Sequence, residues 1–507
     1  MNYFNKTPRY LMIASTSFFA SFLQADAVVE EGLYRNNLKN RFLTASALPR
    51  NSSLHSSLVL EQWSLAPDKN FEEPSCQKPN SSCCFGIQDA KYVYEAIFES
   101  SIFDHYYLQI AEKAVHLKHL SEDIKTLLAI PSQTPEEKRV LHEILLRVLR
   151  NKLDKRETLK PNEQEDLDTL SFYLLADAHV FPQQSDIMAE YLDLSDEFIQ
   201  SKPLSQHVDD AFAKLEAVFS STSQYQKKDP NYFDLHLDGF LPTPLFSIDS
   251  SQYLYMFNPM IQDKRSKKNT INPIFISYLR HLKKNNQKHL YINVQSRIGE
   301  LEELAESAEF KGTFFIATFN KDDDFYYQEN AWELKSDASQ FKKNLMQSFC
   351  ECEERVQWPQ ELLLNNWYAK LPSIFDQIHA EHFHNAPNLD AEKRGIFVEI
   401  ACARLVQEIR NFYKPDYINA TCAYTMDRGP GQYAADYVYE LFEKNGQLTV
   451  KEKRSLLTLY FISPIISQNR PSHEYRVIRL SAMLRVLFQD DTSVVEEFER
   501  KRPVQFF

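Results

Sequence analysis

The sequence Asp416–Phe442, DYINATCAYTMDRGPGQYAADYVYELF, contains the change of pattern that decides the fold. Its segment Tyr417–Thr421 is a short, largely apolar run with turn-forming residues just past it, which is typical of a buried strand. Farther along, Ala434, Val438 and Leu441 recur on one face of a helix. The loop between them begins with a cysteine and ends with an arginine. We therefore expect a strand, a tight loop and a helix N-terminus, in that order.

Such a loop has the chemistry of an oxyanion site. Backbone N–H groups turn inward where a loop closes onto a helix start, and the helix dipole adds positive potential there. Cys422 lies at the entrance of the loop, where this field favours its thiolate form and makes it a nucleophile. Arg428 lies at the exit, where its planar guanidinium can hold two phosphate oxygens.

CAYTMDRG, residues 422–429, resembles the signature loop of the cysteine-dependent phosphatases. It is most similar to the Cys-x4-Asp-Arg form of phosphoinositide phosphatases of the myotubularin, Sac-domain and bacterial inositol-phosphate types. The resemblance implies that Cys422 forms a cysteinyl-phosphate, that Arg428 stabilises the transferring group, and that Asp427 matches the aspartate preceding the arginine. It implies no metal or other cofactor, and a phosphoprotein or phosphoinositide substrate. The residues that it implies around the phosphate are Ala423, Tyr424, Thr425, Met426 and Gly429.

The loop departs from the family pattern at four positions. Gly429 stands where those families usually have Ser or Thr, and Thr425 where many have glycine. Ala423 and Met426 stand where the bacterial inositol-phosphate group has lysines. Two interpretations therefore stay open: an exported phosphatase, or an exported binding protein whose loop holds a phosphate group without turnover.

Composition restricts the wider function. The chain has 507 residues, a net charge of −13 and 43% hydrophobic residues, which suits two or three domains with sizeable cores. The acidic balance argues against non-specific nucleic-acid binding and gives no support for a basic membrane-docking surface.

The N-terminal segment 1–27 has the pattern of a secretory signal peptide. Lys6 and Arg9 precede the apolar run Tyr10–Leu23, which is followed by Ala25-Asp26-Ala27. The run is shorter than the about 20 residues of a transmembrane helix. We expect cleavage after Ala27 and an exported mature chain without a membrane span; an uncleaved anchor is the competing interpretation. Since oxidising compartments inactivate reactive thiolates, an active enzyme needs a reducing destination such as a host-cell cytosol.

The rest of the chain divides by pattern into three parts. Residues 28–85 carry Ser, Asn and Pro clusters and predict an irregular leader. Residues 86–223 show repeated helical stripes and predict a helical bundle. After a linker at 224–238, strands alternate with helices through 239–507. This alternation predicts an α/β domain with a mostly parallel, helix-covered sheet, which the resemblance makes phosphatase-like.

Phosphate-ester cleavage needs a general acid for the leaving oxygen. The predicted strand Thr313–Phe319 is followed by three aspartates, and parallel strands end at one sheet edge. Asp323 and Asp324 are therefore candidates for the acid, with Asp427 as the alternative inside the loop. The alternative to any such role is a solvated acidic turn.

His379, His382 and His384, with Glu381, form the other concentration of possible ligands. Only His379 and His382 share a helix face, and nothing nearby completes a recognised metal pattern. We expect ordinary surface or packing histidines and no metal.

Overall fold

The computed structural model describes residues 102–130, 135–177, 192, 194–220, 243–255, 259–262, 269–328, 337–351, 355–422, 427–468 and 472–488. All of them belong to one compact unit, Asn80–Phe507. The predicted signal peptide (1–27), the leader (28–85) and the linker (224–238) lie outside the described residues. Among the helices that are described, none combines the length and apolar character needed to cross a membrane.

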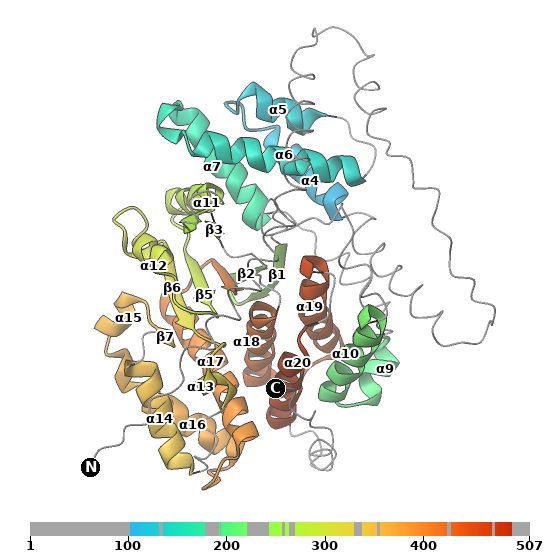
Figure 1. Cartoon of the computed structure of the whole chain (residues 1–507), viewed down its shortest axis with the longest axis vertical. Helices are drawn as coiled ribbons and strands as arrows, with labels where there is room; N and C mark the ends of the chain where they lie inside the picture. The colour runs from blue at the N-terminus through green and yellow to red at the C-terminus, as the bar shows by residue number, and fades with distance from the viewer. Residues whose placement is uncertain are drawn as a thin grey trace, which may run out of the picture. The chain divides into compact units, whose positions relative to one another are not determined.

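The α/β class is confirmed, and a six-stranded sheet lies at its centre (Figure 1). The strand order is β1 (Thr243–Ile248), β2 (Ser251–Tyr255), β8 (Tyr417–Thr421), β5 (His289–Asn293), β6 (Phe314–Phe319) and β7 (Val356–Gln357). The four inner strands are parallel, whereas β1 and β7 pair antiparallel at the two edges. The sheet is therefore mixed, with a parallel centre, because a hairpin and a short returning strand form its edges. A separate ribbon pairs β3 (Met260–Gln262) with β4 (Asn269–Ile271).

Helices cover both faces of the sheet. The ring of Tyr413, at the end of α17 (Ala391–Tyr413), lies 4.0 Å from that of Phe315 on one face. On the other face, Tyr278 of α11 (Pro273–Lys284) reaches His289. The remaining helices of this region are α12 (Gly299–Glu306), α13 (Asp324–Tyr327), α14 (Ala338–Glu351), α15 (Gln360–Leu364), α16 (Leu371–Phe383), α18 (Arg428–Asn445), α19 (Val450–Gln468) and α20 (Glu474–Phe488).

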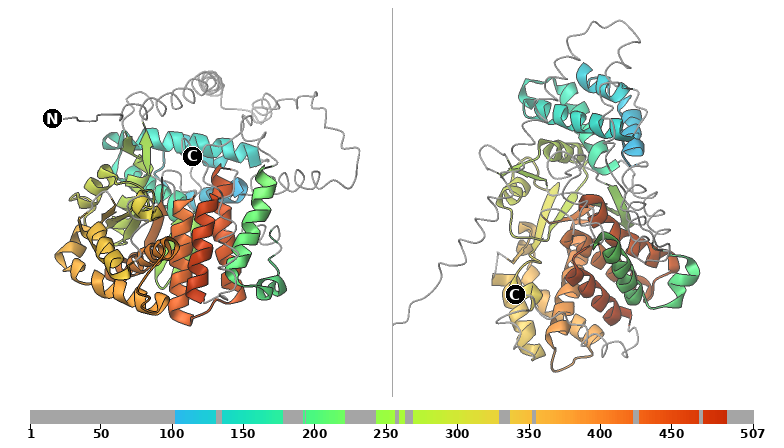
Figure 2. Two further views of the ribbon diagram at one scale, coloured as in Figure 1. Left: turned by 60° about the horizontal axis from the view of Figure 1, so that its bottom comes forward. Right: turned by 45° about the vertical axis from the view of Figure 1, so that its right-hand side comes forward.

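Helices from the first half of the described chain pack onto this core. They are α4 (Ile102–Ala114), α5 (Glu122–Ala129), α6 (Pro135–Leu153), α7 (Pro161–Phe172), α9 (Asp196–Ser201) and α10 (Leu204–Ser220). Asp168 of α7 pairs with Arg156 at 2.6 Å and accepts a hydrogen bond from Ser277 of α11. Helix α10 lies beside α19 and α20, with Arg485 of α20 2.7 Å from Asp209 (Figure 2). The division into a helical and an α/β domain stays a prediction.

Tyr433 attaches helix α18 to the sheet. Its buried hydroxyl accepts a hydrogen bond from the Ala420 N–H at 2.9 Å and donates one to the Leu254 carbonyl at 2.7 Å. Strand β2 pairs with β8 only through Gln252 and Tyr253. The Tyr433 hydroxyl therefore links the two strands beyond the end of their ladder. The side chain thereby sets where α18 begins relative to the end of β8.

Tyr433→Phe should lower the free energy of unfolding by about 2 kcal/mol, because it leaves a buried N–H and a buried carbonyl without partners. Chemical denaturation measures this change. Tyr368→Phe, at a tyrosine that is 37% exposed, is the matched control. Equal small losses from both variants would contradict the bridging role.

One face of the central strands is polar although it is buried. Three hydrogen bonds cross between strands there: His289 Nε2 to Asn419 Oδ1 (2.6 Å), Tyr291 to Thr421, and Asn293 to Thr318 (3.2 Å). A slip of one residue would send every one of these groups to the opposite face and leave it unpaired. This ladder therefore specifies the register of the three strands that carry the candidate site.

His289 makes the ladder sensitive to acid. Burial lowers the pKa of His289 from its ordinary value of 6.5 to about 4, with the Asn419 hydrogen bond acting the other way. The unfolded chain therefore binds a proton that the folded chain rejects between these values, so stability falls as pH falls through this window.

His289→Gln should reduce the dependence of unfolding free energy on pH by about 1.4 kcal/mol per pH unit between pH 6 and 4.5. Urea denaturation across this range measures the slope for wild type and variant. His116→Gln, at an exposed histidine, serves as control. Identical slopes for all three proteins would show that His289 is not buried as a neutral ring.

Candidate phosphate-binding site

The strand and the helix expected from the sequence on either side of the loop are present. Strand β8 ends at Thr421, Cys422 follows it, and α18 begins at Arg428. Cys422 is a free cysteine, 4% exposed and packed in the core. Pro430 lies in the first turn of α18, where its missing N–H leaves no helical bond unmade. The predicted phosphate-binding residues Ala423, Tyr424, Thr425 and Met426 lie outside the described residues, and Gly429 is buried.

The carboxyl ends of the parallel strands β8, β5 and β6 lie at one edge of the sheet. Strand β6 ends at Phe319, two strands away from β8, and the chain continues into Lys321 and Asp322. Asp322 Oδ2 lies 2.9 Å from Arg428 Nη1, which forms an ion pair between the two strand ends. The Asp322 carboxylate thus pairs with the Arg428 guanidinium, which the sequence analysis expects to bind phosphate.

A second arginine reaches the same place from helix α20. Arg476 Nη2 donates to the Lys321 carbonyl and to the Tyr327 hydroxyl, both at 2.7 Å, and lies 3.8 Å from Asp322 Oδ1. Its guanidinium also lies over the rings of Tyr326 and Tyr327, at 4.9 and 5.2 Å. These contacts fix its position before any ligand arrives.

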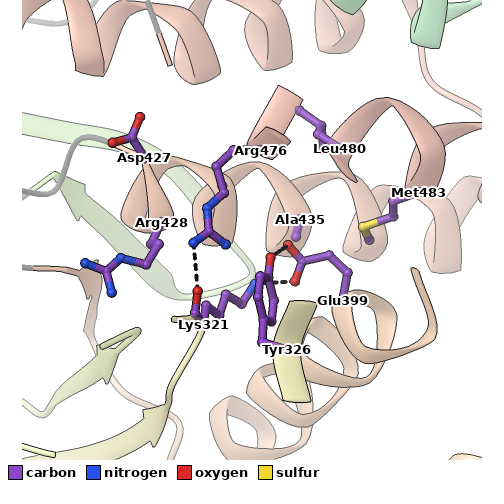
Figure 3. Close-up of a pocket in the computed structure, with 10 residues that line it drawn as sticks. Lys321, Tyr326, Glu399, Asp427, Arg428, Ala435, Arg476, Leu480 and Met483 are labelled. Carbon is purple, nitrogen blue, oxygen red and sulfur yellow. Dashed lines mark hydrogen bonds and ion pairs between the residues drawn. The ribbon is translucent and has the colours of Figure 1, made fainter. Parts of the chain in front are cut away.

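These groups surround a small cavity (Figure 3). Its polar lining consists of Lys321, Tyr326, Glu399, Asp427, Arg428 and Arg476. The cavity measures about 10 Å³, which is room for about one water molecule. A phosphate group is larger than this volume, so it fits only if side chains around the cavity move.

A buried ion pair forms the floor of this cavity. Lys321 Nζ lies 2.5 Å from Glu399 Oε2, and the Tyr326 hydroxyl donates to Glu399 Oε1 at 2.8 Å. Burial acts to raise the pKa of Glu399, but the charge and hydrogen bond of Lys321 outweigh it and lower that pKa. Glu399 is therefore ionised and neutralises Lys321, which leaves the two arginines as the cations available to a ligand.

The three predicted general acids have different surroundings. Asp323 is the N-cap of α13 and pairs with Arg355 at 2.7 Å, and Asp324 is exposed in the first turn of that helix. Asp427 lines the cavity and accepts a hydrogen bond from the His473 N–H at 2.9 Å. Among these three, only Asp427 borders the cavity.

Sequence reasoning did not single out the other cavity residues. Asp322 was noted only as part of an acidic turn, and Lys321, Glu399 and Arg476 carry no motif. Glu399 is an isolated charge among apolar residues, which predicts burial of a paired charge rather than a particular site, whereas Lys321 and Arg476 have charged neighbours in the sequence and look like surface residues.

Two of the three histidines, His379 and His382, pack within the described structure. His379 is buried and its Nε2 hydrogen-bonds with the Ala386 carbonyl at 2.9 Å. His382 packs on the rings of Tyr439 and Phe442, and burial lowers its pKa to about 4. Within the described chain, His382 lies with Glu381 and Glu443 closely enough to hold a cation, but Glu443 already pairs with Arg404 at 3.2 Å. We therefore assign no metal there.

Comparison of the chain with protein-family models, with curated protein sequences and with solved structures finds no match.

The cavity floor has a measurable stability signature. Lys321→Met should lower the unfolding free energy by about 3–5 kcal/mol, because it leaves the buried Glu399 carboxylate without its cationic partner. The double variant Lys321→Met/Glu399→Gln should lose less than this single variant. Lys393→Met, in an exposed pair with Asp390, should lose less than about 1 kcal/mol. Denaturant unfolding measures all three, and equal losses from Lys321→Met and Lys393→Met would refute the assignment.

Proposed function

We propose that the chain is an exported cysteine-dependent phosphatase that hydrolyses phosphate monoesters of proteins or phosphoinositides. The observation that carries the proposal is the position of Arg428, the arginine of the Cys-x5-Arg sequence, which lines a cavity with Lys321 and Arg476 and meets Asp322 just past the carboxyl end of parallel strand β6. Helix N-termini and arginines at such an edge are suited to bind phosphate. The phosphatase-like domain, the export signal and a reducing destination are parts of this proposal.

The chemistry divides between residues of the loop and the cavity. The Cys422 sulfur attacks phosphorus, and the bond to the ester oxygen breaks with its electrons going to that oxygen. Asp427 supplies the proton to the leaving oxygen. Arg428 and the loop amides stabilise the charge on the transferring group. Water then attacks the cysteinyl-phosphate, Asp427 takes its proton, and inorganic phosphate leaves as the thiolate re-forms.

A second candidate function is phosphate binding without turnover. Two observations favour it: Cys422 is only 4% exposed, and the cavity that Arg428 lines has room for about one water molecule. A nucleophile must reach phosphorus, so turnover requires a loop conformation that uncovers the sulfur. The departures at Thr425 and Gly429 favour the same alternative.

Cys422→Ser should reduce turnover at least about a thousandfold, and Arg428→Met at least about a hundredfold. Phosphate release by the full chain under reducing conditions, from phosphopeptides and from phosphoinositides, measures the effect. Cys350→Ser, at a free cysteine elsewhere, should leave turnover unchanged.

Thermal unfolding of each variant separates loss of chemistry from loss of fold. Wild-type turnover in Cys422→Ser would eliminate the cysteinyl-phosphate mechanism. No turnover by the wild-type chain on either substrate class, with phosphate binding retained, would favour the binding protein.

A further inference from the structure

Two arginines in the cavity share one carboxylate. Arg428 begins α18 and Arg476 lies in α20, and both approach Asp322, at 2.9 and 3.8 Å. Glu399 pairs directly with Lys321, at 2.5 Å, and acts on Arg476 only as a neighbouring charge. Asp427 also lines the cavity, so the formal charges of Arg428, Arg476, Asp322 and Asp427 balance, and removal of Asp322 would leave one positive charge in excess.

One nitrogen of the Arg476 guanidinium is available to bind an anion. Its side chain is 8% exposed, so it is largely removed from water. Nη2 is committed to Lys321 and Tyr327, whereas Nη1 is buried and has no hydrogen-bond partner among the described residues. A buried cationic N–H without an acceptor is costly, and an anion in the cavity would supply that acceptor.

Arg479 provides an internal comparison. Its Nη1 is also buried and unpaired within the described chain, but it lies against Gly395, where a Cβ would collide with it. Its guanidinium lies over the rings of Tyr326 and Tyr475, and the side chain does not line the cavity. Arg479 is therefore a packing residue, and Arg476 is the one placed to meet a ligand.

Asp322 can leave its position without disturbing the core. Its side chain is 52% exposed, and besides the arginines it contacts only the Tyr327 hydroxyl, at 3.1 Å, among described hydrogen-bond partners. Rotation into solvent would free both guanidiniums. A phosphate dianion would then match two positive charges better than one carboxylate does.

We propose that Arg476 is a phosphate-binding residue of this site, and that Asp322 is an internal competitor which a phosphate-type dianion displaces. The proposal concerns the site of the proposed function, but it requires binding only and no reaction. The ligand group is a phosphate monoester or inorganic phosphate, held between Arg428 and Arg476 at the start of α18.

The test is calorimetric titration of inorganic phosphate into the full chain carrying Cys422→Ser, at about pH 8 where phosphate is largely dianionic. Arg476→Met should weaken binding about tenfold or more. Asp322→Asn should strengthen it several-fold, a gain that misfolding cannot produce. Arg485→Met, on the same helix but paired with Asp209, and Asp324→Asn, in the same acidic turn, should leave affinity unchanged.

Wild-type affinity in Arg476→Met, or weaker binding in Asp322→Asn, would overturn the proposal. A lipid-borne and a free phosphate are distinguished by vesicles containing a phosphoinositide and by its water-soluble headgroup. Dependence on Arg476 in either arm supports the assignment, and independence in both refutes it. Tighter phosphate binding by Asp322→Asn, in a chain whose wild type shows no Cys422-dependent turnover, would uphold this inference while the phosphatase proposal fails.

Discussion

The buried ion pair between Lys321 and Glu399 is the constraint on which the candidate site depends. Both charges are removed from water, so each is tolerable only because the other, together with the Tyr326 hydroxyl, compensates it. The pair joins the chain just past β6 to the middle of α17. It thereby fixes the direction of the Lys321 carbonyl, which accepts from Arg476, and of the next residue, Asp322, which meets Arg428.

The site is consequently assembled from four separate parts of the chain: the end of β6, helix α17, the start of α18 and helix α20. The turn after β6 holds both arginines, since Arg428 pairs with Asp322 and Arg476 donates to the Lys321 carbonyl, so both guanidiniums are positioned without a ligand. Arg479 is likewise positioned without a ligand, by packing against Gly395. A glycine inside a helix costs about 1 kcal/mol relative to alanine, but here it leaves the room that a buried guanidinium occupies.

Local patterns predicted the elements around the loop well. Strand 417–421 and the following helix are where the sequence indicates, because one apolar run and one helical stripe suffice to define them. The sequence did not predict which aspartate of the acidic turn after β6 reaches Arg428. Asp323 caps α13 and Asp324 opens it, so the residue that reaches Arg428 is Asp322, a choice made by how the short helix begins. The sequence analysis also did not predict the antiparallel edge strands β1 and β7. Which segment pairs at a sheet edge depends on the tertiary packing around it.

The sequence by itself determined the α/β class and the spacing of Cys422 and Arg428 across a strand-to-helix loop, because these follow from neighbouring residues and their periodicity. The tertiary structure alone decided that Arg476 joins Arg428, that Asp322 lies between them, and that Lys321 and Glu399 form the floor. Those residues are far apart in the chain and carry no motif. Their meeting follows from how helix α20 packs on α17 and α18 beside the end of β6, which sets the distances on which every charge interaction depends.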